Sequence, residues 1–378
     1  MIDSGLYEGY DTALMALDEL TQRSVRYLVS LVGNYPDDQL EAALSRHLPA
    51  VVTFYGQAAA QAALEFYRQE RASSGPADDF EPRVAEPIPA EWVAEDVAEA
   101  MEPQRKGSSD RAGLAENLAG RAVRRVRGRA DRTITFNAER DPARPKWAIV
   151  PHVGACPWCI MYASWGFHYR SEQSAKAQRH TNCQCVVVKD SDTDNPALEG
   201  YDPDGMRERL LQCGRDFGAE GEDWDRSMEV AGLYDREWLR TGARPEVGYA
   251  SEEVWEKKWR DPKAHGFERG TAEILASHGF KTTFWDDEGR SDLDTGVEIK
   301  TIYAATSYNT FSSHISNAAK KQGLELLVVD VYLNEAVDDN QAVAWIERRL
   351  GRYPEIPGVI LVSHTRDLVW VQNRKQNK

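Results

Sequence analysis

Apolar residues recur every three to four positions through the first sixty residues, and this periodicity constrains the fold more than any other feature. In residues 5–32 the repeat consists of Leu6, Tyr10, Leu14, Leu17, Val25 and Leu28. That spacing places them on one face of a helix. A second stripe starts after Asp37 and Asp38, either of which can cap a helix N-terminus, and includes Leu40, Leu44, Leu48, Val52, Tyr55 and Ala59. The N-terminal part is therefore expected to be helical.

Turn-forming residues interrupt this pattern. Serine, glycine and proline are frequent in residues 73–90, which are expected to form a linker or an extended arm. Helices are expected again at 90–101 and 110–130, and short strands at Thr133–Phe136 and Trp147–Val150. Residues 190–205 are expected to be a loop, and residues 241–251 a further boundary.

The composition is that of a globular protein. Of 378 residues, 42% are hydrophobic and 28% are charged, and this length allows two or three domains. No run approaches the ~18 consecutive apolar residues needed to span a bilayer. The acidic N-terminus lacks the pattern of a signal peptide. A net charge of −15 argues against a protein that coats nucleic acid through charge alone.

Charge is unevenly distributed along the chain. Residues 1–101 hold 18 acidic and 6 basic residues, whereas residues 102–146 hold 12 basic and 6 acidic residues. The basic excess includes a run of six arginines, Arg121, Arg124, Arg125, Arg127, Arg129 and Arg132. This run predicts either a contact with nucleic acid or an acidic subunit, or a helix face that balances the acidic neighbour. The acidic helices favour docking to protein, because they repel a phosphate backbone.

Four of the five cysteines lie close together. Cys156 and Cys159 form a C-x-x-C pair, and His180, Cys183 and Cys185 form a second group. Two such groups can surround one metal ion tetrahedrally. We expect a structural zinc site with Cys156, Cys159 and Cys183 as ligands and either His180 or Cys185 as the fourth. The alternatives are buried thiols without metal or a redox pair.

This order of a helical region, a basic helix and a cysteine motif resembles the MuF-like head morphogenesis proteins of tailed phages. The resemblance covers roughly residues 1–190, and its sharpest carriers are Cys156, Cys159, Gly166, His180, Cys183 and Cys185. The family's usual H-P-x-C-R-C ending stands here as H-T-N-C-Q-C, without the proline and the arginine. The resemblance implies a minor capsid protein, present in few copies near the portal, with a C-terminal extension that can be a toxin domain.

Helix and strand patterns alternate after residue 250. Helices are expected at 255–259, 267–278, 312–323 and 339–350, and strands at 281–285, 297–303 and 324–333, followed by a hairpin. The apolar run at 324–333 is typical of a buried central strand. Upstream of this region, the isolated Cys213 is expected to be a core residue rather than a catalytic one.

An acidic residue precedes a Glu-x-Lys motif in this region. Glu298 and Lys300 share one face of the expected strand, and Asp292 lies six residues before Glu298. Carboxylates at such positions can hold a divalent cation, which activates water and polarises a phosphodiester. Lys300 can orient the water or neutralise developing charge. The alternative is an exposed Glu298–Lys300 ion pair of little consequence.

The arrangement resembles the PD-(D/E)xK nuclease superfamily and, more narrowly, the C-terminal tRNA nuclease domains of contact-dependent growth inhibition toxins. The resemblance spans roughly residues 250–375 and is carried by Glu268, Ala272, Leu275, Gly279, Asp292, Glu298, Lys300, Lys321 and Gln322. It implies that Asp292 and Glu298 bind metal and that Lys300 is the catalytic lysine. It also implies that Glu268 is the acid on the helix and that Gln322 supports the site or contacts substrate.

Two of these assignments have rivals in the sequence. Asp294 competes with Asp292, which no proline precedes, and Glu273 competes with Glu268. If the reaction needed no metal, His314 would become the candidate general base.

We therefore expect a multidomain α+β protein with four parts. These are a helical MuF-like domain over 1–145, with a linker at 73–90 and a basic helix at 110–132, a zinc-stabilised β-rich knuckle over 146–190, a connector over 191–249, and an α/β PD-(D/E)xK-like domain over 250–378.

The expected function is that of a phage minor capsid protein whose C-terminal domain hydrolyses phosphodiesters, with tRNA favoured by the resemblance alone. Expected cofactors are structural Zn²⁺ and catalytic Mg²⁺ or another divalent cation. Expected partners are portal and capsid proteins, the nucleic acid substrate and an immunity protein, and the expected location is the phage head and then the host cytoplasm. The alternatives are a purely structural head protein with a C-terminal binding module, and a free toxin not built into a virion.

Overall fold

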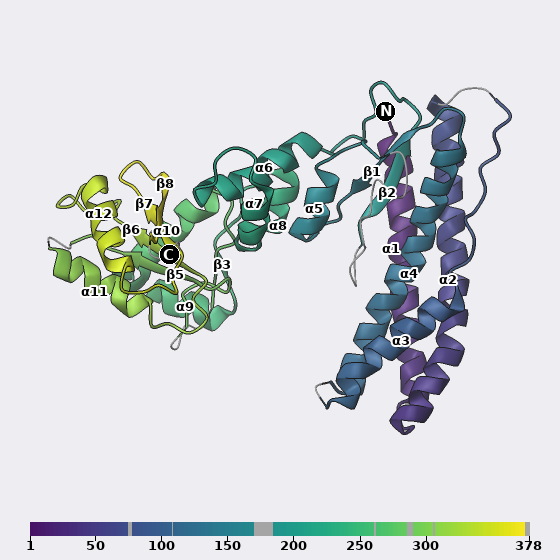
Figure 1. Cartoon of the computed structure of the whole chain (residues 1–378), viewed down its shortest axis with the longest axis horizontal. Helices are drawn as coiled ribbons and strands as arrows, with labels where there is room; N and C mark the ends of the chain where they lie inside the picture. Colours follow the sequence, from purple (N-terminus) through teal and green to yellow (C-terminus); the bar gives the residue numbers. More distant parts are fainter. Residues whose placement is uncertain are drawn as a thin grey trace. The chain divides into compact units, whose positions relative to one another are not determined.

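A computed structural model describes residues 1–74, 78–107, 109–169, 184–260, 262–285, 290–304 and 307–374. The fold is mixed α/β, with a helical N-terminal region and a C-terminal part that contains a sheet (Figure 1). The chain forms two compact units. The N-terminal unit comprises Met1–Ala155 and Cys159–Asp204, and the C-terminal unit comprises Cys156–Trp158 and Gly205–Lys378. Within the described ranges, no helix is both long and apolar enough to cross a membrane.

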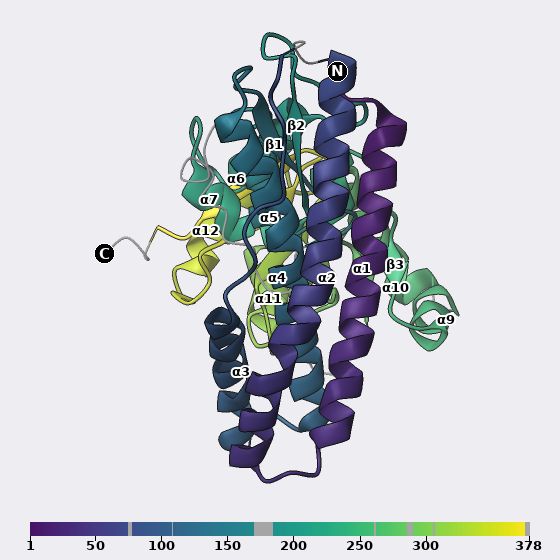
Figure 2. The same ribbon diagram turned by 90° about the vertical axis from the view of Figure 1, so that its right-hand side faces the viewer.

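Long helices form the body of the N-terminal unit. Helices α1 (Ser4–Val32), α2 (Asp37–Ser74) and α4 (Arg111–Arg140) run side by side, and α3 (Ala90–Arg105) packs against α2 and α4 (Figures 1 and 2). The predicted apolar stripes form their shared core, for example through Val25, Leu44 and Val52. Asp3 caps α1 by accepting a hydrogen bond from the Leu6 amide at 2.9 Å.

The strand predicted at Thr133–Phe136 is wrong, because these residues belong to α4. Thr133, Ile134 and Thr135 are all buried, so they pack inside the unit. The Thr133 hydroxyl donates to the Arg129 carbonyl one turn earlier, at 2.9 Å. Burial within a long helix has outweighed the strand preference of β-branched residues.

A two-stranded antiparallel sheet lies in the same unit. Strand β1 (Lys146–Val150) confirms the strand predicted at 147–150, and it pairs with β2 (Val186–Asp190). Helix α5 (Pro157–Ala163) lies between these strands in sequence. Trp147 stacks on Tyr169 at 4.7 Å between ring centroids, and both side chains are buried.

The C-terminal unit opens with short helices. These are α6 (Pro203–Asp216), α7 (Trp224–Val230), the 3₁₀ helix η2 (Ala231–Leu233) and α8 (Arg236–Thr241). Cys213 is buried on α6, and its thiol lies 3.2 Å from the Arg209 carbonyl. Burial raises the pKa of this thiol well above its usual value. The prediction that Cys213 is a core residue is confirmed.

A four-stranded sheet forms the main core of this unit. The strand order is β5 (Val297–Thr301), β6 (Leu326–Asp330), β7 (Gly358–Val362), β8 (Leu368–Gln372). The first three strands are parallel and β8 is antiparallel to β7. Helices α11 (Tyr308–Ala318) and α12 (Asp339–Leu350) supply apolar residues to the core of one sheet face. As predicted, β6 is buried throughout.

A smaller layer adjoins the β5 edge. It contains α9 (Glu252–Arg260), α10 (Pro262–Ser277) and the parallel pair β3 (Gly248–Tyr249) and β4 (Thr283–Phe284). Phe284 of β4 forms a bridge to Leu293, which lies in the turn that leads into β5. This layer brings α9, α10 and the turn before β5 together.

Candidate active site at the edge of the C-terminal sheet

Strand β5 positions two of the predicted site residues. Glu298 and Lys300 alternate with buried apolar residues, and they stand in register with Leu327 and Val329 of β6. Side chains two positions apart share a face. Glu298 and Lys300 therefore share one face of β5, as predicted.

Asp292 lies in the turn before β5. Its Oδ2 accepts a hydrogen bond from the Ile299 amide at 2.8 Å. Only 2% of the residue is exposed. Since β5 is an edge strand of the four-stranded sheet, Asp292 occupies an amide that no neighbouring strand of that sheet uses. This bond fixes the carboxylate beside Glu298.

A buried lysine, Lys258 of α9, joins the site from the other side. Its Nζ lies 2.9 Å from Glu268 Oε2 on α10 and 3.8 Å from Asp292 Oδ1. It also lies 4.9 Å from the centre of the Phe284 ring. Lys258 is not among the residues predicted from the sequence. The signal was present, because Lys258 falls four residues after the buried Val254 on an amphipathic helix.

Glu298 is fully buried and pairs with lysine. Its Oε1 lies 2.5 Å from Lys300 Nζ and 3.9 Å from Lys321 Nζ. Its Oε2 is buried and accepts no hydrogen bond from any described residue. Glu268, Asp292 and Glu298 are called the carboxylate cluster below, and its lysine partners are Lys258, Lys300 and Lys321.

The pKa values in the cluster reflect burial and proximity. The pKa of Asp292 is raised to about 7 by burial first, and then by the negative charges of Glu298 and Glu268. The pKa of Lys300 is also raised. Burial lowers this pKa, but the negative charges of Asp292 and Glu298 together raise it by more. Burial and the charge of Lys300 lower the pKa of His314 on α11. His314 therefore lies within electrostatic reach of Lys300 and is neutral near pH 7.

The two rival acids lie elsewhere. Asp294 Oδ2 accepts a hydrogen bond from Lys281 Nζ at 2.6 Å, and Glu273 is exposed on α10. The geometry therefore brings Asp292 and Glu268 to the cluster rather than their rivals. Gln322 follows Lys321 and lines a pocket beside the site.

The cluster has the chemistry of a divalent cation site. Mg²⁺ takes oxygen ligands, and the unbonded Glu298 Oε2 is a buried carboxylate oxygen beside the carboxylate of Asp292. Among the described residues, however, no three His, Cys, Asp or Glu side chains already surround one metal position. Lys258 occupies the space between Glu268 and Asp292, so a cation held by all three acids would have to displace it.

The predicted zinc ligands are only partly described. Cys159 lies buried on α5, Cys156 precedes that helix half-buried, and Cys185 is buried just before β2. His180 and Cys183 lie outside the described residues. The zinc site accordingly stays a prediction.

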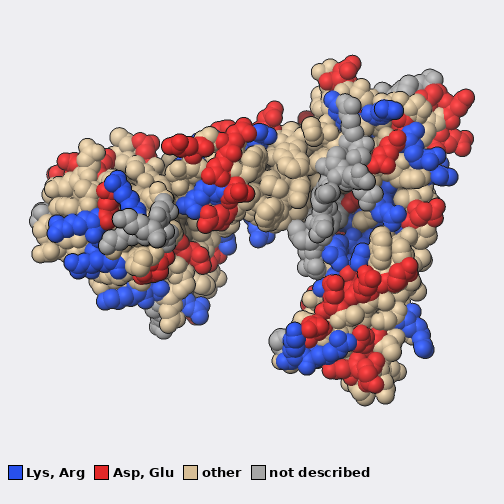
Figure 3. All heavy atoms as spheres, viewed as in Figure 1, with Lys and Arg blue, Asp and Glu red and all other residues tan. Residues whose placement is uncertain are grey.

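The arginine run of α4 pairs with groups inside the N-terminal unit. Asp96 of α3 pairs with Arg124 at 2.7 Å and with Arg125 at 2.6 Å. Arg127 is buried and pairs with Asp18 of α1 at 2.8 Å. Acidic and basic side chains are accordingly interspersed on the face seen in Figure 3. These contacts favour the interpretation that the run balances its acidic neighbours.

Comparison with known proteins identifies one family. A family model described as VG15 protein matches residues 1–213. No curated protein and no solved structure gives a match to the chain. The matched region covers the whole N-terminal unit and more than half of the sequence. The chain therefore belongs to the VG15 protein family, which is phage-derived.

Proposed function

We propose that this phage protein is a minor capsid protein of the MuF-like type whose C-terminal unit is a metal-dependent nuclease effector acting on tRNA. The observation that carries the nuclease is the convergence of Asp292, Glu298 and Lys300 at the edge of a sheet, with Glu268 beside them. These residues come from two parts of the chain, helix α10 and the continuous turn and strand 292–300. Their chemistry, buried carboxylates next to a half-buried lysine, suits phosphodiester hydrolysis.

Each residue has a distinct task in this proposal. Asp292 and Glu298 would hold Mg²⁺, with Glu268 completing the ligand set. The bound cation would supply charge stabilisation and an activated water. Lys300, with Nζ at the carboxylate of Glu298, would orient that water and neutralise charge on the phosphate. Lys321, 3.9 Å from Glu298, adds positive charge for the substrate backbone.

The direct test is cleavage by the purified full chain. Total tRNA and plasmid DNA would each be incubated with wild type, Lys300→Ala and a control, with Mg²⁺ and with EDTA. Lys106→Ala is a matched control, because Lys106 is an exposed residue just after α3 whose only described ion pair is with Glu102. Lys300→Ala is expected to lower the rate at least ~100-fold, and EDTA to abolish cleavage.

The outcomes separate the candidate functions. Cleavage by wild type and Lys106→Ala, but not by Lys300→Ala, supports the nuclease, and the substrate that disappears names its class. Cleavage that survives EDTA would shift the role of base to His314, which lies near Lys300 and is neutral near pH 7. No cleavage of either substrate by folded wild type would favour the alternative, a structural head protein with a C-terminal binding module.

The capsid role is supported by the family of residues 1–213 and by the sequence resemblance of residues 1–190 to MuF-like proteins. Portal and capsid proteins are its proposed partners, and the phage head followed by the host cytoplasm its proposed location. Mass spectrometry of purified particles is expected to find the chain in few copies. Its absence from particles would favour a free toxin. An immunity protein is proposed as a further partner, since a producing cell must restrain an active nuclease.

Structural zinc is proposed for the cysteine motif, with four ligands from Cys156, Cys159, His180, Cys183 and Cys185. Metal analysis of the full chain is expected to find about one zinc per molecule. Cys159→Ser should lose the zinc, whereas the core variant Cys213→Ala should keep it. Equal zinc content in both variants, or none in wild type, would refute the assignment.

A further inference from the structure

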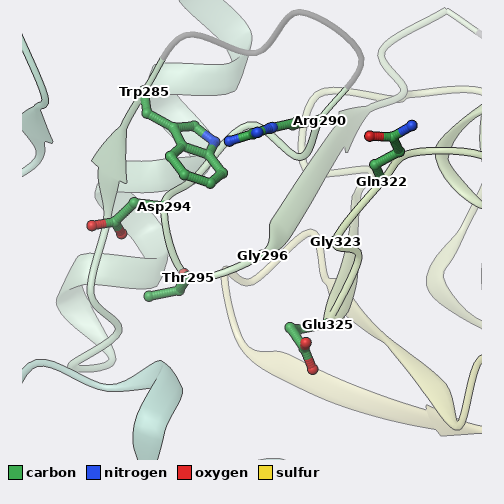
Figure 4. Close-up of a pocket in the computed structure, with 8 residues that line it drawn as sticks. All are labelled: Trp285, Arg290, Asp294, Thr295, Gly296, Gln322, Gly323 and Glu325. Atoms are coloured by element: carbon green, nitrogen blue, oxygen red, sulfur yellow. The ribbon is translucent and has the colours of Figure 1, made fainter. Parts of the chain in front are cut away.

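A pocket of about 500 Å³ opens beside the carboxylate cluster. Its walls come from Trp285 and Arg290, from the turn before β5, and from the segment between α11 and β6 (Figure 4). A volume of this size is in the range of sites for small organic ligands. None of the proposed catalytic acids lines it, so the pocket is distinct from the cluster.

One wall presents an aromatic ring held in place. The Trp285 indole Nε1 donates to the Ser291 carbonyl at 2.8 Å. The Arg290 guanidinium lies 5.4 Å from the centre of the indole ring, and Figure 4 shows the two side chains pointing toward each other. Aromatic rings and guanidinium planes are the surfaces on which proteins stack nucleobases.

Two glycines, Gly296 and Gly323, contribute backbone without a side chain to the lining of the pocket. Gly296 has φ +82°, and a Cβ added there would lie 2.6 Å from Glu325 Cγ and 2.7 Å from the Gly323 carbonyl oxygen. The Gly296 carbonyl accepts a hydrogen bond from the Glu325 amide at 2.9 Å. A residue with a side chain would disrupt this junction between β5 and β6. The glycine therefore allows these two segments to approach closely at the pocket.

Polar atoms at the pocket lack partners within the described ranges. The Thr295 hydroxyl is buried and forms no hydrogen bond there, and the same is true of Asp294 Oδ1. The Gln322 amide adds both donor and acceptor capacity at the opposite wall. Such groups suit the hydrogen-bonding edge of a heterocycle rather than an apolar ligand.

The pocket is also tied to the proposed active site along the chain. Arg290 and Asp294 each lie two residues from Asp292, and Gln322 follows Lys321, whose Nζ is 3.9 Å from Glu298. A nucleic acid strand with one phosphate at the carboxylate cluster therefore has the pocket beside it. Arg290 and Lys321 can neutralise the phosphates of that strand.

We propose that this pocket binds one unpaired nucleobase of the substrate next to the cleaved phosphate, stacked on Trp285 and contacted by Thr295 and Gln322. This inference rests on the proposed nuclease function. It adds the site that selects where the nucleic acid is cut. A base must leave its stack to enter such a pocket, so single-stranded regions are favoured over a duplex.

The pocket can be tested without any cleavage. The full chain would be labelled with ¹⁵N-tryptophan, which gives one indole signal for each of its 11 tryptophans. The Trp285→Phe variant identifies the Trp285 signal by its loss. GMP, AMP, CMP, UMP and ribose 5-phosphate would then be titrated. At least one mononucleotide should shift the Trp285 signal and ribose 5-phosphate should not.

Variants then separate stacking from packing. Trp285→Leu is expected to weaken mononucleotide binding about tenfold or more, whereas Trp285→Phe should retain most of it because the ring is kept. Trp92→Ala, which removes a tryptophan of α3 in the other unit, should bind like wild type. In the tRNA assay, Trp285→Leu should change the positions of cleavage, while Trp285→Phe keeps them.

Three results would overturn the pocket assignment. They are a Trp285 signal that no mononucleotide moves, an equal shift with ribose 5-phosphate, or wild-type cleavage positions in Trp285→Leu. Failure of the nuclease itself is distinguishable, because wild type would then cut nothing while the Trp285 signal still reports on base binding.

Discussion

At the scale of single residues, the site is organised by buried charges of opposite sign. Lys258 and Glu298 are fully buried and Asp292 nearly so. A buried charge is costly unless it is paired. Lys258 offsets Glu268 and Asp292, while Lys300 offsets Glu298. The lysines thus stabilise three carboxylates that would otherwise repel one another, and Lys258 stands where a shared cation would bind.

Replacing Lys258 is expected to strengthen metal binding. In Lys258→Met the ammonium no longer competes for Glu268 and Asp292, so Mg²⁺ should bind about tenfold more tightly by calorimetry. The melting temperature without metal should fall, and Mg²⁺ should restore it. Lys281→Met is the matched control, since Lys281 pairs with Asp294 outside the cluster. An unchanged or weaker affinity in Lys258→Met would show that Lys258 does not occupy the cation position.

A histidine outside the site gives a pH-dependent contribution to stability. The His364 ring contacts two oxygens, with Nε2 2.8 Å from the Asn334 carbonyl and Nδ1 2.6 Å from Asp339 Oδ1. The contact with the Asn334 carbonyl, and to a smaller degree the one with Asp339, raises the pKa of His364 above 6.5 in the folded state. The stability that protonated His364 contributes to the folded state is therefore complete below the pKa of histidine in the unfolded chain. It is lost as the pH rises through the higher pKa of His364 in the folded state.

His364→Gln should accordingly cost more stability in acid than in base. Urea denaturation would compare the free energy of unfolding of wild type and variant at about pH 5.5 and about pH 8.5. His47→Gln, at an exposed position of α2, serves as control. A cost that is equal at the two pH values, or larger at the higher one, would contradict the assignment.

The sequence could predict some of these residues but not others. The two-residue period of a strand suffices to put Glu298 and Lys300 on one face. The choice of Asp292 over Asp294 needed the structure, because it depends on which carboxylate reaches the Ile299 amide. Lys258 lies on helix α9, 34 residues before Asp292. Its contact is a product of tertiary packing and leaves only a faint local pattern.

At the scale of elements, the arginines of helix α4 connect it to the other helices of the N-terminal unit. Its arginines reach Asp96 on α3, Asp18 on α1 and Gln57 on α2. Asp96 is the focus of this network, since it is buried and Arg121, Arg124 and Arg125 all lie within ion-pair distance. One carboxylate of α3 therefore holds three arginines of α4.

Removing that carboxylate should destabilise the helical unit. Asp96→Asn leaves three partly buried guanidinium groups without their shared partner and should cost about 2 kcal/mol of unfolding free energy. Glu99→Gln is a matched control on the same helix, because Glu99 is largely exposed although it pairs with Arg121. The two variants would be compared by urea denaturation followed by circular dichroism. Equal costs would refute the central role of Asp96.

Periodicity predicted most elements well where the pattern was long. The stripes of α1 and α2 and the apolar run of β6 are long enough to define both type and position. The strand predicted at Thr133–Phe136 was wrong, since a run of only four residues is consistent with a strand and also with a buried stretch of helix. Only the continuity of α4 across 111–140 resolves that ambiguity.

At the scale of the whole molecule, two units carry different chemistry. The N-terminal unit pairs arginines of α4 with acidic residues of neighbouring helices, on a helical scaffold that belongs to a phage-derived family. The C-terminal unit holds the carboxylate cluster and the pocket beside it. The sequence patterns predicted a helical N-terminal region and a C-terminal part that contains a sheet, as the structure has them. The pocket was beyond them, because it is formed by backbone segments that only the folded sheet brings together.

The central claim is that the carboxylate cluster cleaves phosphodiesters, and its most direct test is the dependence of tRNA cleavage on Mg²⁺ in wild type and Glu298→Gln. The substitution removes a buried charge while keeping the shape of the side chain, and Glu347→Gln on α12 is a control at a surface ion pair. We expect a wild-type rate that rises to saturation with Mg²⁺ and a loss of at least ~100-fold in Glu298→Gln. Equal rates in the two folded proteins, or no cleavage by wild type at any Mg²⁺ concentration, would contradict it.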